Sequence, residues 1–263
     1  MFYKNKLAYL LIFLVYSNQC FSTLDKQIVQ ISARKCGTYL LMKCINLLTG
    51  RTGIKATEYE HLDEITLDKL EQFTNLTEDC FFRNHLVYRP EYASIMVKNR
   101  CKIILIYRDP RDQIISYIYY RKKMGHDKHL SIDKAISSLI MHSDMYYEKN
   151  IKNIKSFYDA YLPWSDIPGA LTVRFEDLVG PQGGGCIQKQ YECIKKINAH
   201  LEYNNNDEML AYVANNLFGD TRTFRKGIIG DWKNHFTPAH KQAFKEVAGQ
   251  LLIDLGYEKD FNW

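Results

Sequence analysis

The chain has 263 residues, of which 46% are hydrophobic and 25% are charged, and its net charge is +5. This composition is ordinary for a globular protein, and the length allows one large α/β domain or two small ones. The charge is too small to indicate nucleic-acid binding by itself. The basic residues gather instead in short clusters, which favours a small anionic ligand. The clusters are Arg34-Lys35, Arg108, Arg111, Arg121-Lys122-Lys123 and Arg225-Lys226.

The first 22 residues have the pattern of a cleavable secretory signal. Lys4 and Lys6 precede a ten-residue apolar run from Leu7 to Tyr16, which is shorter than the roughly 20 residues of a membrane-spanning helix. We therefore predict a signal peptide at 1–22, a domain at 23–263 and a protein in the secretory pathway or secreted, with no stable membrane span. The alternatives are that the run is a buried helix and that the protein is cytoplasmic.

The next stretch predicts a short strand, a tight basic turn and an amphipathic helix that Gly50 and Gly53 end. A helix that starts directly after a turn exposes backbone N–H groups, which attract phosphate or sulfate. Lys35 adds a positive charge and Thr38 a hydroxyl. The turn has one glycine and is not the G-x-x-x-x-G-K-[ST] loop. By itself, this pattern also fits a strand–turn–helix without a ligand.

Further elements follow in chain order. Lys102–Tyr107 is continuously apolar, as in a central parallel strand covered on both faces. The glycine-rich segment 180–185 is predicted to be a loop tip that tolerates insertion. Other strands are expected at 80–86 and 170–175. Helices are expected at 63–73, 90–97, from 111 onward, at 131–161 with a second amphipathic helix over 146–158, and at 187–200, 207–216 and 238–255.

Strands near residues 28, 81, 103 and 172 alternate with helices, which predicts a single α/β domain with a mostly parallel central sheet flanked by helices. In such a sheet the ligand lies beyond the carboxyl ends of the strands. Three of the four polar groups that follow the strands are cationic or contain histidine, which indicates a site for transfer of an anionic group. The four groups are Arg34 to Thr38, Arg83 to His85, Arg108 to Asp112, and Glu176-Asp177.

With these residues in view, the chain resembles sulfotransferases of the cytosolic type, which use 3′-phosphoadenosine 5′-phosphosulfate (PAPS). The first family motif, usually P-K-S-G-T-T-W, is degenerate here at residues 34–40. The second, an arginine with a serine eight residues later, is Arg108 and Ser116. The third, R-K-G-x-x-G-D-W-K, is complete at residues 225–233 and is highly specific. The family's K-T-H segment corresponds to Arg83-Asn84-His85. The resemblance covers roughly residues 27 to 257.

The resemblance implies a P-loop NTPase-like fold of the sulfotransferase type, PAPS as co-substrate and no metal. His85 would be the general base, and Lys35 would stabilise the leaving phosphate. The 5′-phosphosulfate would be bound by the turn residues Lys35, Cys36, Gly37, Thr38 and Tyr39. The 3′-phosphate would be bound by Arg108, Ser116, Arg225 and Lys226, with Gly227 allowing close backbone approach. The adenine would contact Phe175 and, by a looser alignment, Phe218.

The acceptor is expected to be a small molecule with a hydroxyl or amine, and a homodimer is a possible assembly. Two other functions remain open. A nucleotide-dependent small-molecule kinase is disfavoured by the incomplete glycine loop and the lack of a clear magnesium carboxylate. An inactive PAPS-binding relative is supported by the degenerate first motif. Cys36 is either a tolerated substitution, which we favour, or a reactive thiol, and Trp232 is expected to be core packing.

Overall fold

The computed structural model describes residues 26–55, 65–75, 80–142, 151–219 and 224–263. The predicted signal peptide at 1–22 lies outside these ranges. So do residues 63–64 and 146–150 of the two helices expected at 63–73 and 146–158. None of the helices within the described ranges combines the length and hydropathy that a membrane crossing requires.

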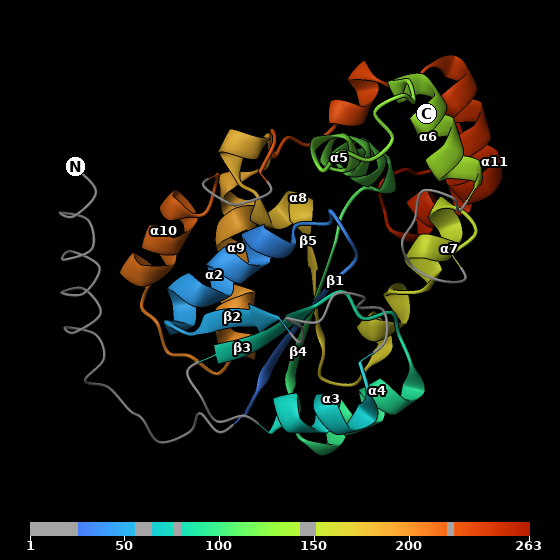
Figure 1. Ribbon diagram of the computed structural model, residues 1–263. Coiled ribbons are helices and arrows are strands. Elements are labelled where there is room, and N and C mark those ends of the chain that lie inside the picture. The colour runs from blue at the N-terminus through green and yellow to red at the C-terminus, as the bar shows by residue number, and fades with distance from the viewer. Residues whose placement is uncertain (1–25, 56–64, 76–79, 143–150, 220–223) are drawn as a thin grey trace.

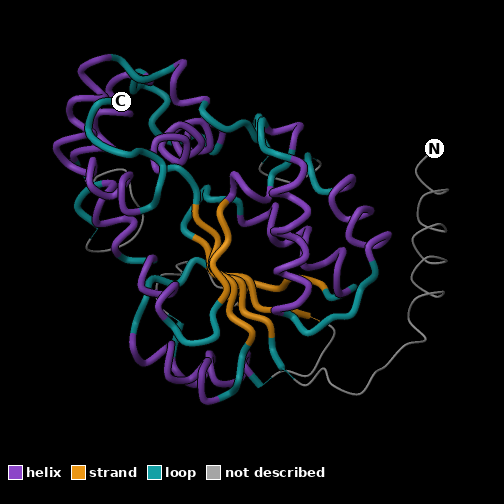
Figure 2. The backbone as a smooth tube through the Cα atoms, turned by 180° about the vertical axis from the view of Figure 1, so that it is seen from behind, coloured by secondary structure: helices purple, strands orange, loops and turns teal. Residues whose placement is uncertain are grey.

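A five-stranded sheet forms the centre of the molecule, and all of its pairings are parallel. In spatial order its strands are β2 (Thr52–Lys55), β3 (Cys80–Asn84), β1 (Ile28–Ser32), β4 (Lys102–Tyr107) and β5 (Leu171–Arg174). The predicted single α/β domain with a parallel sheet is therefore confirmed, as are its four expected strands. Figure 2 shows the strands as one twisted layer between helices.

The edge strand β2 was not predicted, because Gly53 was interpreted as a helix terminator. Gly50 alone caps the preceding helix, with a left-handed φ of 72°. Gly53 lies inside β2, and a Cβ there would be 2.7 Å from Cζ of Phe81. The glycine at position 53 thus makes room for an aromatic ring of the neighbouring strand.

Helices cover both faces of the sheet (Figure 1). Their bounds are α2 (Thr38–Thr49), α3 (Leu67–Thr74), α4 (Pro90–Lys98), α5 (Pro110–Lys123), α6 (Ile132–Met141), α7 (Ile154–Asp159), α8 (Phe175–Leu178), α9 (Ile187–His200), α10 (Asp207–Asn216) and α11 (Pro238–Asp254). Of the helix expected over 146–158, the described residues contain α7, which begins at Ile154. Short 3₁₀ turns occur at Leu162–Asp166, Pro181–Gly183 and Asp231–Asn234.

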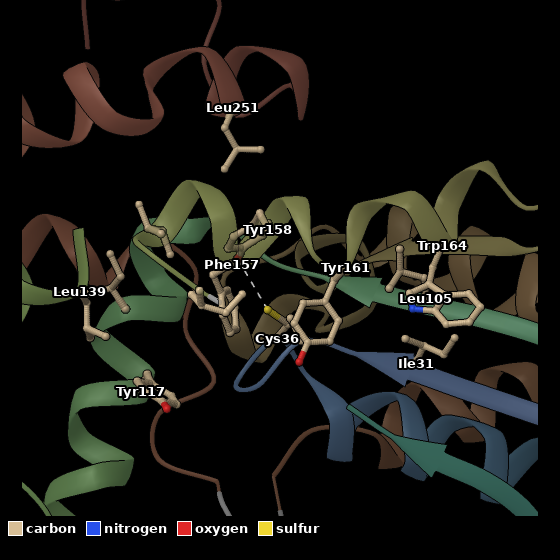
Figure 3. Packing of buried hydrophobic residues seen from close by; sticks show 14 of the residues in the cluster. Ile31, Cys36, Leu105, Tyr117, Leu139, Phe157, Tyr158, Tyr161, Trp164 and Leu251 are labelled. Carbon is tan, nitrogen blue, oxygen red and sulfur yellow. Dashed lines mark hydrogen bonds between the residues drawn. The ribbon is translucent and has the colours of Figure 1, made fainter. Parts of the chain in front are cut away.

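Alternate strand residues supply two hydrophobic cores, as the two-residue period of a strand requires. Ile28 and Ile104 pack with α2, α9 and α10 on one face. Val29 and Leu105 point to the other face and join the larger cluster around α5, α6, α7 and α11, part of which Figure 3 shows. Trp232 is 5% exposed and belongs to this larger cluster, so its predicted role in packing is confirmed.

Candidate functional site

A pocket opens where the chain leaves the carboxyl ends of the strands, and it brings together nearly all the predicted site residues. Those lining it are Lys35, Gly37, Thr38, Tyr39, His85, Arg108, Ser116, Phe175, Phe218, Arg225, Lys226 and Gly227. Of the residues predicted for catalysis or PAPS binding, only Cys36 is absent from the lining. Glu176 and Asp177, the fourth polar group, also lie outside it; a carboxylate oxygen of Glu176 accepts a hydrogen bond from the backbone N–H of Asp109 at 2.9 Å.

The turn between β1 and α2 depends on Gly37. Its φ of 106° is left-handed, and a Cβ at this position would lie 2.8 Å from the ring of Phe175 and 3.0 Å from Ile106. Both the backbone conformation and the close packing therefore favour glycine. The helix begins directly afterwards, and no described side chain caps its first N–H groups. These groups and the helix dipole make the turn suitable for an anion.

Lys35 lies in a cationic environment. Burial, together with the positive charges of Arg108, Lys123 and Arg225, lowers the pKa of Lys35 from 10.5 to about 8. Its Nζ is 4.5 Å from the ring centroid of Tyr120, which also lines the pocket. An anion bound here would restore the charged form of the amine.

His85 follows the last residue of β3 and is held in one orientation. Its Nδ1 is 2.7 Å from the carbonyl oxygen of Ser32, and its own carbonyl accepts a hydrogen bond from the Tyr161 hydroxyl at 3.0 Å. Because a carbonyl can only accept, this contact assigns the proton of the neutral ring to Nδ1. Nε2 is then the nitrogen that can receive a proton. Nearby, the Thr38 hydroxyl is 2.8 Å from the Ser32 hydroxyl.

The second and third motifs meet through a carboxylate that the sequence analysis did not single out. Asp112 is buried, and its two oxygens accept hydrogen bonds from the backbone N–H groups of Gly230 and Trp232 at 2.7 and 2.9 Å. Arg108 lies 3.7 Å from the same carboxylate and donates to the carbonyl of Ile228 at 2.8 Å. Asp112 thereby fixes the 225–233 segment against the start of α5. The feature of the sequence that could have indicated this role is the position of Asp112, four residues after Arg108 and in the first turn of α5.

Arg225 and Lys226 share one buried partner, Asp231. Arg225 contacts the Asp231 carboxylate at 2.5 Å and Lys226 at 2.9 Å. Burial alone would raise the pKa of Asp231, but these hydrogen bonds and charges hold it well below its usual range. The carboxylate therefore remains ionised and orients both cations at the pocket.

The glycine-rich segment 180–185 differs from its prediction. It is not an unattached loop tip, because the backbone N–H of Ile229 donates to the Gly183 carbonyl at 2.9 Å. A Cβ on Gly183 would lie 2.5 Å from the carbonyl oxygen of Gly227. The segment therefore packs against the backbone of the third motif, and an insertion in it would displace that motif and disturb the pocket. The sequence offered no signal for this long-range contact.

Cys36 faces the protein core. Its side chain is fully buried, and Sγ lies 3.6 Å from the Tyr158 hydroxyl (Figure 3). Burial raises the pKa of this thiol to about 12, despite the hydrogen bond to Tyr158. A reactive thiolate is therefore disfavoured, as expected for a tolerated substitution. The backbone N–H of Cys36 donates to the carbonyl of Ala33 at 3.2 Å, so it is already engaged within the turn.

Comparison with known proteins identifies the family. A family model described as the sulfotransferase domain matches residues 25–256. The chain belongs to the sulfotransferase family. This assignment confirms the predicted family of PAPS-dependent transferases and, with the parallel sheet, the predicted fold class. It also favours sulfuryl transfer over the kinase alternative.

Individual relatives of this sulfotransferase are distant. Sulfotransferase 6B1 of Danio rerio is 26% identical over 247 residues, covering 85% of this chain and 77% of the relative. The 3-alpha-hydroxysteroid sulfotransferase of Cavia porcellus is 22% identical, covering 63% of this chain and 60% of its own length. The crystal structure of mouse sulfotransferase SULT7A1 complexed with PAP has a TM-score of 0.65 at 21% identity, covering 89% of this chain and 87% of that one.

Within the described residues, no group of three or more histidine, cysteine, aspartate or glutamate side chains is arranged to hold a metal ion.

Proposed function

We propose that this sulfotransferase transfers the sulfuryl group of PAPS to a hydroxyl or amine of a small-molecule acceptor. The observation that carries the proposal is the meeting of His85, Lys35 and the cations of two motifs in one pocket. The structural neighbour SULT7A1 was crystallised with PAP, the desulfated product of PAPS. The pocket offers suitable partners for both phosphates, the adenine and the reacting group.

The 3′-phosphate would lie between Arg108, Ser116, Arg225 and Lys226. Arg108 has a buried Nε with no hydrogen-bond partner among the described residues, and a phosphate oxygen would satisfy it. An arginine fork suits several phosphate oxygens at once. The left-handed Gly227, with φ of 65°, would let the backbone approach the phosphate.

The adenine would pack near Phe175 and Phe218, which both line the pocket. The ring of Phe175 is already 4.2 Å from the Arg108 guanidinium carbon, so one aromatic side chain would contact both the base and a phosphate ligand. Phe218 packs edge-to-face against Phe224, with ring centroids 5.2 Å apart. Flat apolar surface of this kind is what a purine stacks on.

The 5′ end would lie over the β1–α2 turn. The backbone N–H groups of Gly37, Thr38 and Tyr39 would bind the phosphosulfate oxygens. Lys35 would contact the bridging oxygen and neutralise the charge that develops on the departing phosphate. The Thr38 hydroxyl would add a donor on the same side, next to Ser32.

His85 would act as the general base through Nε2, since the Ser32 carbonyl engages Nδ1. Bound PAPS supplies the sulfuryl group, whose bond to the 5′-phosphate oxygen breaks as sulfur bonds to the acceptor, with the electron pair remaining on PAP. His85 takes the acceptor's proton as this happens, and Lys35 stabilises the phosphate. A positioned base of this type contributes about 10²–10⁴-fold to a rate.

The test compares binding with turnover. Wild-type protein, His85→Ala and the exposed control His142→Ala are titrated with PAP by calorimetry and assayed for transfer of labelled sulfate to a panel of phenols, alcohols and amines. We expect His85→Ala to lower turnover by at least 10²-fold with PAP affinity unchanged, and the control to behave as wild type. Equal loss of binding and turnover would make His85 structural. Binding of PAP with no transfer to any acceptor would favour the inactive-relative alternative.

A further inference from the structure

The segment that follows α11, residues 257–263, lies outside the span 25–256 that the family model matches. The family assignment therefore gives it no role. Figure 1 shows this end of the chain near α5 and α11. Trp263 packs against Phe244 of α11, with ring centroids 6.1 Å apart, and none of the seven residues lines the pocket. The segment nevertheless contacts residues that adjoin the proposed ligands of the 3′-phosphate.

The contacts of this segment converge on Arg111, a residue of α5 that is 2% exposed. Its Nη1 is 2.5 Å from a carboxylate oxygen of Glu258, and its Nη2 is 2.8 Å from a carboxylate oxygen of Asp109. The guanidinium carbon lies 4.1 Å from the ring centroid of Trp232 and 4.6 Å from that of Trp263. Two carboxylates and two indole rings thus hold one buried guanidinium in a fixed orientation.

Arg111 joins two of the elements that the proposed function assigns to the 3′-phosphate. Asp109 directly follows Arg108 in the sequence, and Trp232 belongs to the motif that begins with Arg225. Because Arg111 contacts both Asp109 and Trp232, it fixes the start of α5 relative to the third motif. The distance between the two phosphate-binding cations therefore depends on a side chain outside the pocket.

The backbone of Asp109 is held from the same segment. One carboxylate oxygen of Glu176 accepts a hydrogen bond from the backbone N–H of Asp109 at 2.9 Å, and the other accepts one from the Tyr257 hydroxyl at 2.8 Å. The Tyr257 ring also lies 4.4 Å from the guanidinium carbon of Arg174, at the end of β5. The segment thus restrains Asp109 twice, through its main chain and through its side chain.

We infer that residues 257–263 position the 3′-phosphate site from outside the pocket. Arg111 transmits the effect, because it holds the residue beside Arg108 and the third motif at the spacing that one phosphate requires. Arg111 is thus a positioning residue, and it acts without touching the nucleotide. The inference rests on the proposed function and adds to it a role for a segment outside the family match.

The experiment compares PAP with adenosine 5′-phosphate, which has the same base and 5′-phosphate but lacks the 3′-phosphate. Calorimetry measures the Kd of both nucleotides for wild type and each variant. We expect the preference for PAP to fall about tenfold or more in Arg111→Met, and about threefold or more in Glu258→Gln and Trp263→Leu. Affinity for adenosine 5′-phosphate should stay within about twofold of wild type. The control Glu246→Gln, which removes an exposed carboxylate of α11, should match wild type.

A purely structural role would give a different result, because a loss of stability alone would not change the ratio of the two affinities. An unchanged preference in Glu258→Gln and Trp263→Leu would therefore overturn the inference, and so would an equal fall in the control. Both positions are partly exposed, so these variants decide the question even if Arg111→Met fails to fold. If wild type binds the two nucleotides equally, the proposed 3′-phosphate site is wrong, and the proposed function fails first.

Discussion

The unusual pKa of Lys35 predicts how PAP affinity depends on pH. Because burial and neighbouring cations lower this pKa to about 8, about nine-tenths of the amines are charged at pH 7 and about one-tenth at pH 9. Bound phosphate would keep the amine protonated over this range. The affinity for PAP should therefore fall about tenfold from pH 7 to pH 9, which corresponds to about 1.4 kcal/mol.

The neighbouring thiol of Cys36 stays protonated over this range, because burial raises its pKa to about 12. Arginine side chains in general are not deprotonated in proteins. A phosphate monoester has its second pKa near 6, so PAP itself is almost fully ionised from pH 7 upward. The fall in affinity can thus be assigned to one amine, provided that a variant without it shows a flat profile.

Calorimetric titration of PAP at half-unit steps from pH 7 to pH 9.5 would measure the effect. Lys35→Met should bind more weakly at pH 7 and show no fall, whereas Lys35→Arg should bind well and also show no fall, because arginine keeps its charge. The reasoning is refuted if wild-type affinity stays constant across the range. It is also refuted if Lys35→Met shows the same tenfold decline as wild type.

Three further outcomes follow from the structure. Lys35→Met should raise the free energy of unfolding at pH 7 by about 1–3 kcal/mol. The reason is that the pKa of Lys35 is lower in the folded than in the unfolded protein, so its charged amine destabilises the fold at pH values below about 8. Chemical denaturation at pH 7 and pH 10 should show that this gain in stability is smaller at the higher pH. Gly183→Ala should lower PAP affinity at least tenfold in calorimetry, since its Cβ would lie 2.5 Å from a backbone carbonyl oxygen of the third motif. The control Gln182→Ala, at an exposed position of the same segment, should retain affinity, and equal losses would argue against steric displacement. Asp112→Asn should cost about 3 kcal/mol of stability and weaken PAP binding, because one backbone N–H would face the new amide group. Thermal unfolding of this variant and of the surface control Asp177→Asn would measure the loss of stability. An unchanged melting temperature for Asp112→Asn would contradict the prediction.

Strand positions were predictable because parallel strands covered on both faces are continuously apolar. Lys102–Tyr107 has such a sequence and is β4. The short strand β2 lacks this signal, since Thr52–Lys55 contains a glycine and only one large apolar residue. The start of α7 was also missed, because the amphipathic pattern predicted a helix over 146–158, whereas residues 151–153 are not helical.

The site was predictable where a motif places a charged residue directly after a strand. Lys35, His85 and Arg108 all follow strands whose carboxyl ends share one edge of the sheet, so their convergence in the pocket follows from topology. The supports of the site were not predictable. Asp112 acts on backbone groups about 120 residues away, and Gly183 matters through the space that its missing side chain leaves. Neither effect produces a local pattern.

The different reactivities of the described cysteines suggest where a fluorescent label could be attached to follow ligand binding. Burial raises the pKa of Cys36 and Cys193 to about 12. Cys186 is exposed just before α9, where hydrogen bonds from the backbone of Lys189 and Gln188 lower its pKa. A maleimide dye should therefore couple to Cys186 in preference to the other two. Its fluorescence would report on the adjoining glycine-rich segment, and thus on nucleotide capture, without touching the pocket.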